Sequence, residues 1–154
     1  MAEPSEQIEF RYDEWAAELA RIEAMARAGR GWVNLRPEVE DDDAAAPRSK
    51  VAGLFSAAGP TVPLATWVAP TGRDPASAGV QHGVAAKVVS RLQEHGVGLP
   101  PGAVVVQDHS RRGLVVRLAD DTGADVILAW MMEAVDDLCP VALTGHWRAD
   151  IHLG

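Results

Sequence analysis

The sequence is poor in cysteine, since Cys139 carries its one thiol. A single cysteine has no partner for a disulfide within the chain, and it excludes a zinc site built from several thiolates. Cys139 stands between a predicted apolar helix and Pro140, with no histidine beside it. We therefore interpret it as a small buried hydrophobic residue and not as a nucleophile.

Long apolar runs are also missing. No stretch approaches the roughly 18 apolar residues that a membrane-spanning helix needs. The first residues, MAEPSEQIEFRYDEW, have neither the basic stretch nor the apolar stretch of a secretory signal. From these absences we expect a protein without membrane segments and, by elimination, a cytoplasmic location.

Positive charge is scarce, because 14 Lys and Arg residues face 22 Asp and Glu residues, for a formal charge of −8. Such a chain repels the phosphate backbone of nucleic acids and the surface of anionic lipids. We therefore expect neither nucleic acid nor membrane as a partner. The partners that stay open are a small anionic ligand, another protein, and a second copy of the chain in a homodimer.

Short catalytic and cofactor motifs are absent as well. The sequence has no phosphate-binding loop, no dinucleotide fingerprint, no nucleophile elbow, no H-E-x-x-H and no EF-hand loop. We accordingly predict no cofactor and no metal ion. The acidic run from Glu38 to Asp43 is interpreted as a solvated loop, because nothing around it supplies the fixed oxygen ligands that Ca²⁺ prefers.

The chain has the length and the apolar content expected of one domain, with 154 residues of which 47% are hydrophobic. We treat residues 1–154 as a single domain. Residues 1–61 form an N-terminal helix and strand extension with an acidic loop at 38–48, and residues 62–154 form the core.

Apolar residues at helical spacing predict three helices. The first covers residues 12–28 and the second covers residues 80–95. The third follows Thr122-x-x-Asp125, which resembles a capping box, and ends at Pro140.

Alternating apolar and polar residues predict strands at 32–39, 62–69, 104–109, 114–118 and 146–153. Pro37 favours an edge position or a strand end for the first of these, and Gly113 can supply the positive φ of the hairpin turn. Residues 50–56 are ambiguous and could form a further short strand.

From residue 62 onward this order is βαββαβ, which is the ferredoxin-like arrangement of an α+β domain. It predicts a four-stranded antiparallel sheet with two helices on one face, and the N-terminal extension covering part of the sheet elsewhere. The expected common core is Ile127, Trp130, Leu138, Val84, Val88, Leu114, Val116, Trp147 and Ile151. Trp15 is also expected in the core, whereas the alternation can place Trp32 and Trp67 on the opposite sides of their strands.

In a ferredoxin-like fold, the start of the first core helix, the tip of the hairpin and the start of the last strand meet at one rim. The candidate ligand-binding residues there are His82, Asp108, His109, Arg111, Arg112, His146 and Arg148, beside Gln81, Gln107 and Thr144. Arginine and histidine donate hydrogen bonds to oxyanions, and a carboxylate can orient a histidine tautomer. The sequence thus predicts an anion-binding rim, and the alternative is a set of solvated loop ends.

Three functions are compatible with this pattern. The first is a binding or regulatory module without chemistry. The second is a small enzyme in which His82 or His109, beside Asp108 or Arg112, performs acid–base chemistry on an anionic small molecule. The third and weakest is a metal held by the histidines of the rim, because the neighbouring arginines would repel a cation. No catalytic residue is assigned.

Overall fold

The computed structural model describes residues 4–40 and 60–154. The ambiguous strand at 50–56 and most of the acidic run lie outside these residues. The elements in chain order are β1 (Glu6–Arg11), α1 (Ala16–Ala28), β2 (Trp32–Val39), β3 (Leu64–Val68), β4 (Ser77–Gln81), α4 (Val89–Glu94), β5 (Val104–His109), β6 (Gly113–Arg117), α5 (Ala124–Leu138) and β7 (Leu143–His152).

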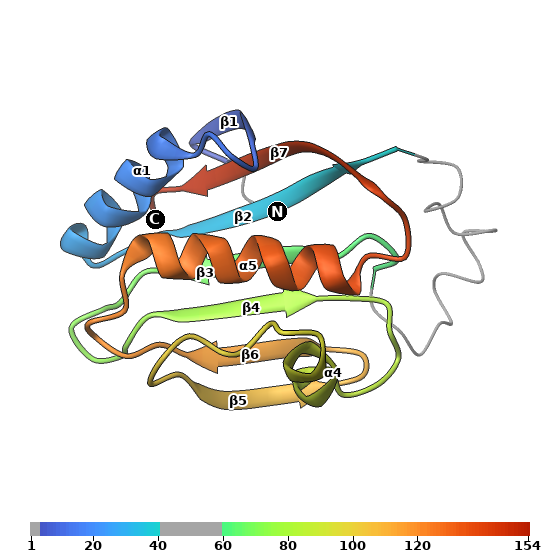
Figure 1. Cartoon of the computed structure of the whole chain (residues 1–154). Helices are drawn as coiled ribbons and strands as arrows, with labels where there is room; N and C mark the ends of the chain where they lie inside the picture. Colours follow the sequence, from blue (N-terminus) through green and yellow to red (C-terminus); the bar gives the residue numbers. More distant parts are fainter. Residues whose placement is uncertain (1–3, 41–59) are drawn as a thin grey trace.

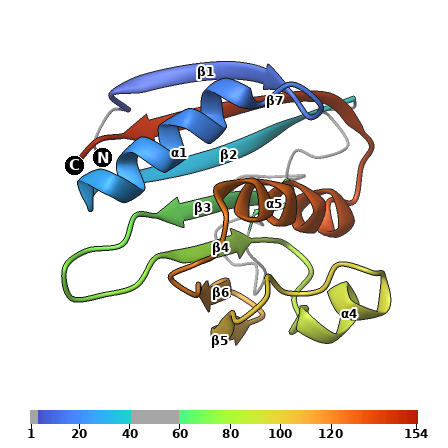
Figure 2. The same ribbon diagram turned by 60° about the vertical axis from the view of Figure 1, so that its left-hand side comes forward.

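The strands form one seven-stranded sheet in the order β1-β7-β2-β3-β4-β6-β5, and every neighbouring pair is antiparallel. All three helices of the described chain lie on one face of this sheet (Figures 1 and 2). Helix α5 crosses the middle of the sheet, α1 lies beside it near β1 and β7, and α4 lies near β5 and β6. None of these helices is both long enough and apolar enough to cross a bilayer.

The mixed α+β class and the antiparallel sheet with helices on one face agree with the sequence analysis. The ferredoxin-like βαββαβ core does not, since the sheet has more strands in a different order. One cause is the segment 80–95, which was predicted as a helix. Its first residues complete β4, Ala85 has a positive φ of 61° that interrupts a right-handed helix, and only Val89–Glu94 is helical.

The second cause is β1, which the sequence analysis did not predict. It pairs along β7, with Phe10 opposite Trp147 and Ile8 opposite Ala149. The described part of the N-terminal extension therefore supplies the edge strand β1 and the inner strand β2 of this sheet, and α1 lies on the same face of the sheet as α5. Pro37 was expected at an edge or at a strand end. Strand β2 is an inner strand, but Pro37 lies near its end, beyond the residues that pair with β3, and the ladder with β7 shifts register just after the proline.

The core lies between the sheet and the helices. Of the residues expected there, all are buried except Val84 and Trp15, which are half-buried against the same cluster. Trp67 also belongs to this core with 1% of its surface exposed. Helix α5 supplies eight of the buried side chains, because apolar residues occupy most of its length. The expected capping box is not formed, since Gly123 caps the helix without a side-chain bond.

The opposite face of the sheet is polar over β1, β7 and β2. The carboxylate of Asp150 accepts a hydrogen bond from Gln7 at 3.0 Å and lies 3.4 Å from Arg36 and 3.2 Å from Arg148. Trp32 stacks on the His152 ring at 4.6 Å between ring centroids. This face is held together across β1, β7 and β2 by paired charges and stacking.

Candidate functional site

The structure brings only part of the predicted rim together. His82, Asp108 and His109 belong to the end of the sheet formed by β4, β6 and β5. His146 and Arg148 belong to β7, and β2, β3, β4 and β6 lie between β7 and β5. Neighbouring strands lie about 4.8 Å apart, so His146 in β7 is roughly 24 Å from His109 in β5, five spacings away, and roughly 14 Å from His82 at the end of β4, three spacings away. The three histidines therefore cannot share one ligand.

His82 follows β4 and is fully buried. Its Nδ1 accepts a hydrogen bond from the Val84 amide at 3.3 Å, and its Nε2 finds no partner among the described residues. Burial lowers the pKa of His82, Arg91 lowers it further, and the carboxylate of Asp108 opposes both. A side chain without solvent contact cannot meet a substrate in this conformation.

Asp108 and His109 are engaged by the backbone. The two carboxylate oxygens of Asp108 accept hydrogen bonds from the amides of Val88 at 2.9 Å and Val89 at 3.2 Å, at the start of α4. The Nδ1 of His109 accepts from the amides of Arg111 and Arg112 at 3.0 and 3.2 Å, which closes the hairpin turn. These hydrogen bonds give both residues a structural role: Asp108 holds the start of α4, and His109 holds the hairpin turn.

His146 and Arg148 instead face the polar side of β7. Arg148 stands opposite Arg36 of β2, and the two guanidinium groups share Asp150. In the part of the chain that the structure describes, no three His, Cys, Asp or Glu side chains are grouped so that they could hold a metal ion.

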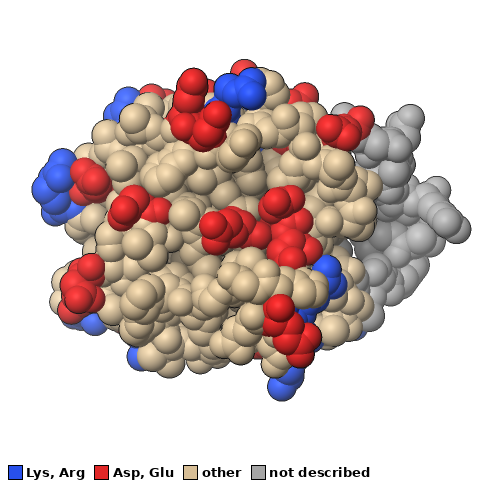
Figure 3. Space-filling view, in the orientation of Figure 1, with Lys and Arg blue, Asp and Glu red and all other residues tan. Residues whose placement is uncertain are grey.

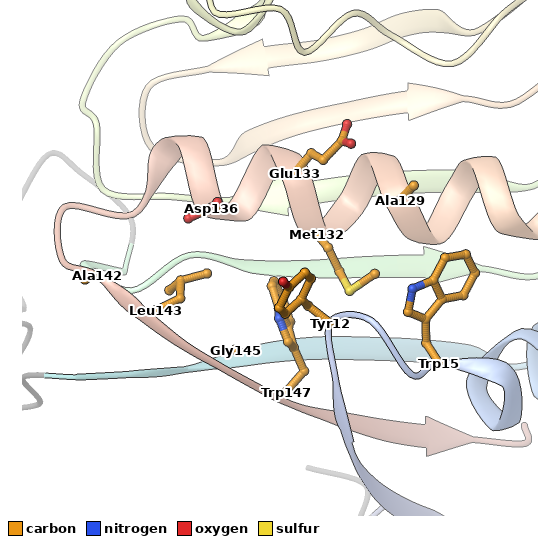
Figure 4. Close-up of a pocket in the computed structure, with 10 residues that line it drawn as sticks. All are labelled: Tyr12, Trp15, Ala129, Met132, Glu133, Asp136, Ala142, Leu143, Gly145 and Trp147. Carbon is orange, nitrogen blue, oxygen red and sulfur yellow. The ribbon is translucent and has the colours of Figure 1, made fainter.

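A different site lies on the helix-covered side, between α5, the β1–α1 turn and the start of β7. It is a hollow of about 450 Å³, open to solvent, which we call the aromatic hollow (Figure 4). It is lined by Tyr12, Trp15, Ala129, Met132, Glu133, Asp136, Ala142, Leu143, Gly145 and Trp147.

The β1–α1 turn positions Tyr12 and Trp15. The amide of Tyr12 donates to the Gly145 carbonyl at 3.0 Å, and the amide of Glu14 donates to the Arg11 carbonyl at 2.9 Å. Gly145 has a φ of +94°, and a Cβ at this position would lie 3.4 Å from the Tyr12 ring. The positive φ is a backbone conformation that L side chains rarely adopt and that glycine allows in β7, whereas the 3.4 Å distance is an ordinary van der Waals contact.

The base of the aromatic hollow belongs to the core. Met132 and Trp147 are buried, with 7% and 3% of their surfaces exposed, and Trp147 stacks on Phe10 with ring centroids 6.5 Å apart. The rings of Tyr12 and Trp15 form the walls, with Tyr12 exposed and Trp15 half-buried. The base is therefore rigid, and the walls are open to a ligand.

The rim on α5 is acidic. This helix contains Asp125, Glu133, Asp136 and Asp137 and no Lys or Arg. Figure 3 shows the helix-covered face of the molecule, where acidic side chains outnumber basic ones over this helix. Asp137 is paired with Arg91 at 3.7 Å and with His95 at 2.8 Å. Within the described residues, Glu133 and Asp136 form no ion pair.

Sequence patterns did not predict the aromatic hollow. Trp15 and Trp147 were assigned to the core, and Tyr12 was assigned to the first turn of a helix that in fact begins at Ala16. Two signals were present in the sequence: aromatic residues immediately before a helix, and acidic residues at the end of another helix. They meet in space only because β1 pairs with β7.

No family model, no characterised protein and no solved structure matches the chain. Inferences about its function therefore rest on the geometry and charges described above.

Proposed function

We propose that the chain is a non-catalytic binding module that holds a small ligand with an aromatic or aliphatic body in the aromatic hollow. The observation that carries this proposal is the lining, in which the rings of Tyr12, Trp15 and Trp147 surround the side chain of Met132. The volume of about 450 Å³ lies in the range of small-molecule sites.

Apolar burial supplies the affinity. Each Å² of apolar surface removed from water contributes about 25 cal/mol, and aromatic pairs add a further stacking term. Because Met132 and Trp147 are already fixed in the core, a ligand has to order only the two wall residues. The two carboxylates that line the aromatic hollow, Glu133 and Asp136, are exposed, and neither forms an ion pair with a histidine among the described residues, so binding is favoured over acid–base catalysis.

Benzyl alcohol is a suitable neutral probe. With the five tryptophan indole N–H signals assigned by NMR, a titration should shift the Trp15 and Trp147 signals while those of Trp67 and Trp130 stay in place. Ala129→Leu adds apolar volume to the aromatic hollow from within a helix and should abolish these shifts.

The matched control is Ala20→Leu, an exposed position of α1 outside the aromatic hollow, and it should leave the titration unchanged. Shifts confined to other tryptophans, or shifts that survive Ala129→Leu with unchanged affinity, would place the ligand elsewhere and reject the proposal.

The hairpin tip is a second candidate site, for an anion. Arg111 and Arg112 are exposed there, and Asp108, the acid next to them in sequence, is occupied by the amides of α4. We expect inorganic phosphate to perturb the amide signals of residues 109–113, and Arg112→Ala to remove the effect while Arg73→Ala does not. If the amide signals of residues 109–113 do not shift at millimolar phosphate, the hairpin tip is a solvated turn and not an anion site.

A further inference from the structure

We infer that the ligand of the aromatic hollow is a small organic cation, with a protonated amine beside its apolar body. This inference rests on the proposed function and adds the charge of the ligand. It is drawn from Asp136, an exposed carboxylate at the rim, in the last turn of α5.

The carboxyl-terminal end of a helix carries the negative end of the helix dipole, so acidic residues are unfavourable there. The last turn of α5 contains Asp136 and Asp137 and no basic residue. Asp137 is compensated by Arg91 and His95 of the neighbouring α4 region. Asp136 has no such compensation from the described residues, and it borders the hollow. A bound cation would supply the missing positive charge.

The remaining lining agrees with a cation. No Lys or Arg is among the residues that border the aromatic hollow. The faces of Tyr12 and Trp15 can attract an ammonium group within about 6 Å of a ring centroid. In Figure 4 the side chain of Glu133 turns away from the rings, so Asp136 is the principal acid of the site.

This arrangement has a signature that a merely solvated aspartate lacks. Asp136→Asn removes an unfavourable charge at a helix end, and the free protein should become slightly more stable. The same change should weaken the binding of a cation. An opposite effect on stability and binding is expected where a residue is kept for a ligand at the expense of the fold.

The experiment compares three probes of similar shape at pH 7.5: benzylamine, which is protonated, benzyl alcohol, which is neutral, and benzoate. Dissociation constants come from the Trp15 indole signal. We expect benzylamine to bind most tightly and benzoate most weakly, with a difference that shrinks as salt is added. Asp136→Asn should weaken benzylamine binding about two- to fivefold, the effect of one exposed charge pair, and leave benzyl alcohol unchanged. Asp125→Asn, at the other end of α5, is the control and should change neither.

The outcomes separate the two proposals. Equal affinity for benzylamine and benzyl alcohol would overturn the cation inference and leave the aromatic hollow as a binding site. Preferential binding of benzoate, or an Asp136→Asn variant that binds benzylamine as well as the wild type does, would also overturn it. Absence of binding by all three probes at millimolar concentration would reject both proposals.

Discussion

Replacing Asp108 by alanine should destabilise the fold around α4. The carboxylate accepts hydrogen bonds from the amides of Val88 and Val89, and Val88 is completely buried. Loss of a capping carboxylate costs about 0.5–2 kcal/mol, and a buried amide without a partner costs about 1–3 kcal/mol. Both costs describe loss of the same hydrogen bonds, so they do not add. We expect the free energy of unfolding to fall by about 2 kcal/mol, which lowers the Tm by roughly 4–8 °C for a chain of this size.

Urea unfolding followed by circular dichroism measures this loss. Asp108→Asn keeps an oxygen that can accept one of the two hydrogen bonds, and it should recover part of the stability. Asp121→Ala removes an exposed acid and serves as the control for net charge. If Asp108→Ala costs less than about 0.5 kcal/mol, the carboxylate does not cap α4, and its predicted role at a ligand site returns to consideration.

Three further variants test the account of the fold. Burial lowers the pKa of His82 below its ordinary value of 6.5, so the unfolded chain takes up a proton first as the pH falls. Stability should therefore decline below about pH 6.5, and His82→Gln should flatten this decline in urea unfolding between about pH 5 and 8. Trp130→Ala should cost about 3–5 kcal/mol by the same assay, and a cost below about 1 kcal/mol would mean that this face of α5 is not packed. Gly113→Ala should lower the free energy of unfolding by about 1–3 kcal/mol, because the φ of Gly113 is +86° and a Cβ there would collide with the Val80 carbonyl oxygen. The control Gly72→Ala adds a Cβ where nothing is near, and it should leave thermal unfolding unchanged.

The strongly patterned segments were predictable from sequence. The strands at 32–39 and 64–68, the hairpin, the final strand and the long helix each carry an unambiguous period in apolar residues. They also determined which residues are buried, and the predicted core is nearly complete. The positive φ expected of Gly113 is likewise present.

The topology was not predictable because two weak segments decide it. In β1 only Ile8 and Phe10 face the core, among charged neighbours, so the strand has almost no apolar signal. The residues Val80, Val84, Val88 and Leu92 are four apart, which indicates a helix, yet they belong to a strand, a loop and one helical turn. Tertiary packing overrode the local pattern there.

The predicted ligand site was wrong for the same reason, because it depended on the predicted topology. The predicted anion rim required a strand order that would bring His82, His109 and His146 to one end of the sheet, and the actual order places His146 on the far side. The aromatic hollow required the pairing of β1 with β7, which brings Tyr12 to Gly145. A site assembled from three distant segments becomes visible only when all of the pairings are known.

The most direct test of the central claim is an NMR measurement of intermolecular contacts with bound benzylamine. We predict nuclear Overhauser effects from the ring protons of the probe to the methyl group of Met132 and to the indole ring of Trp15. Contacts to Trp32 on the polar face, or contacts scattered over the surface without Met132, would contradict the assignment of the aromatic hollow as the ligand site.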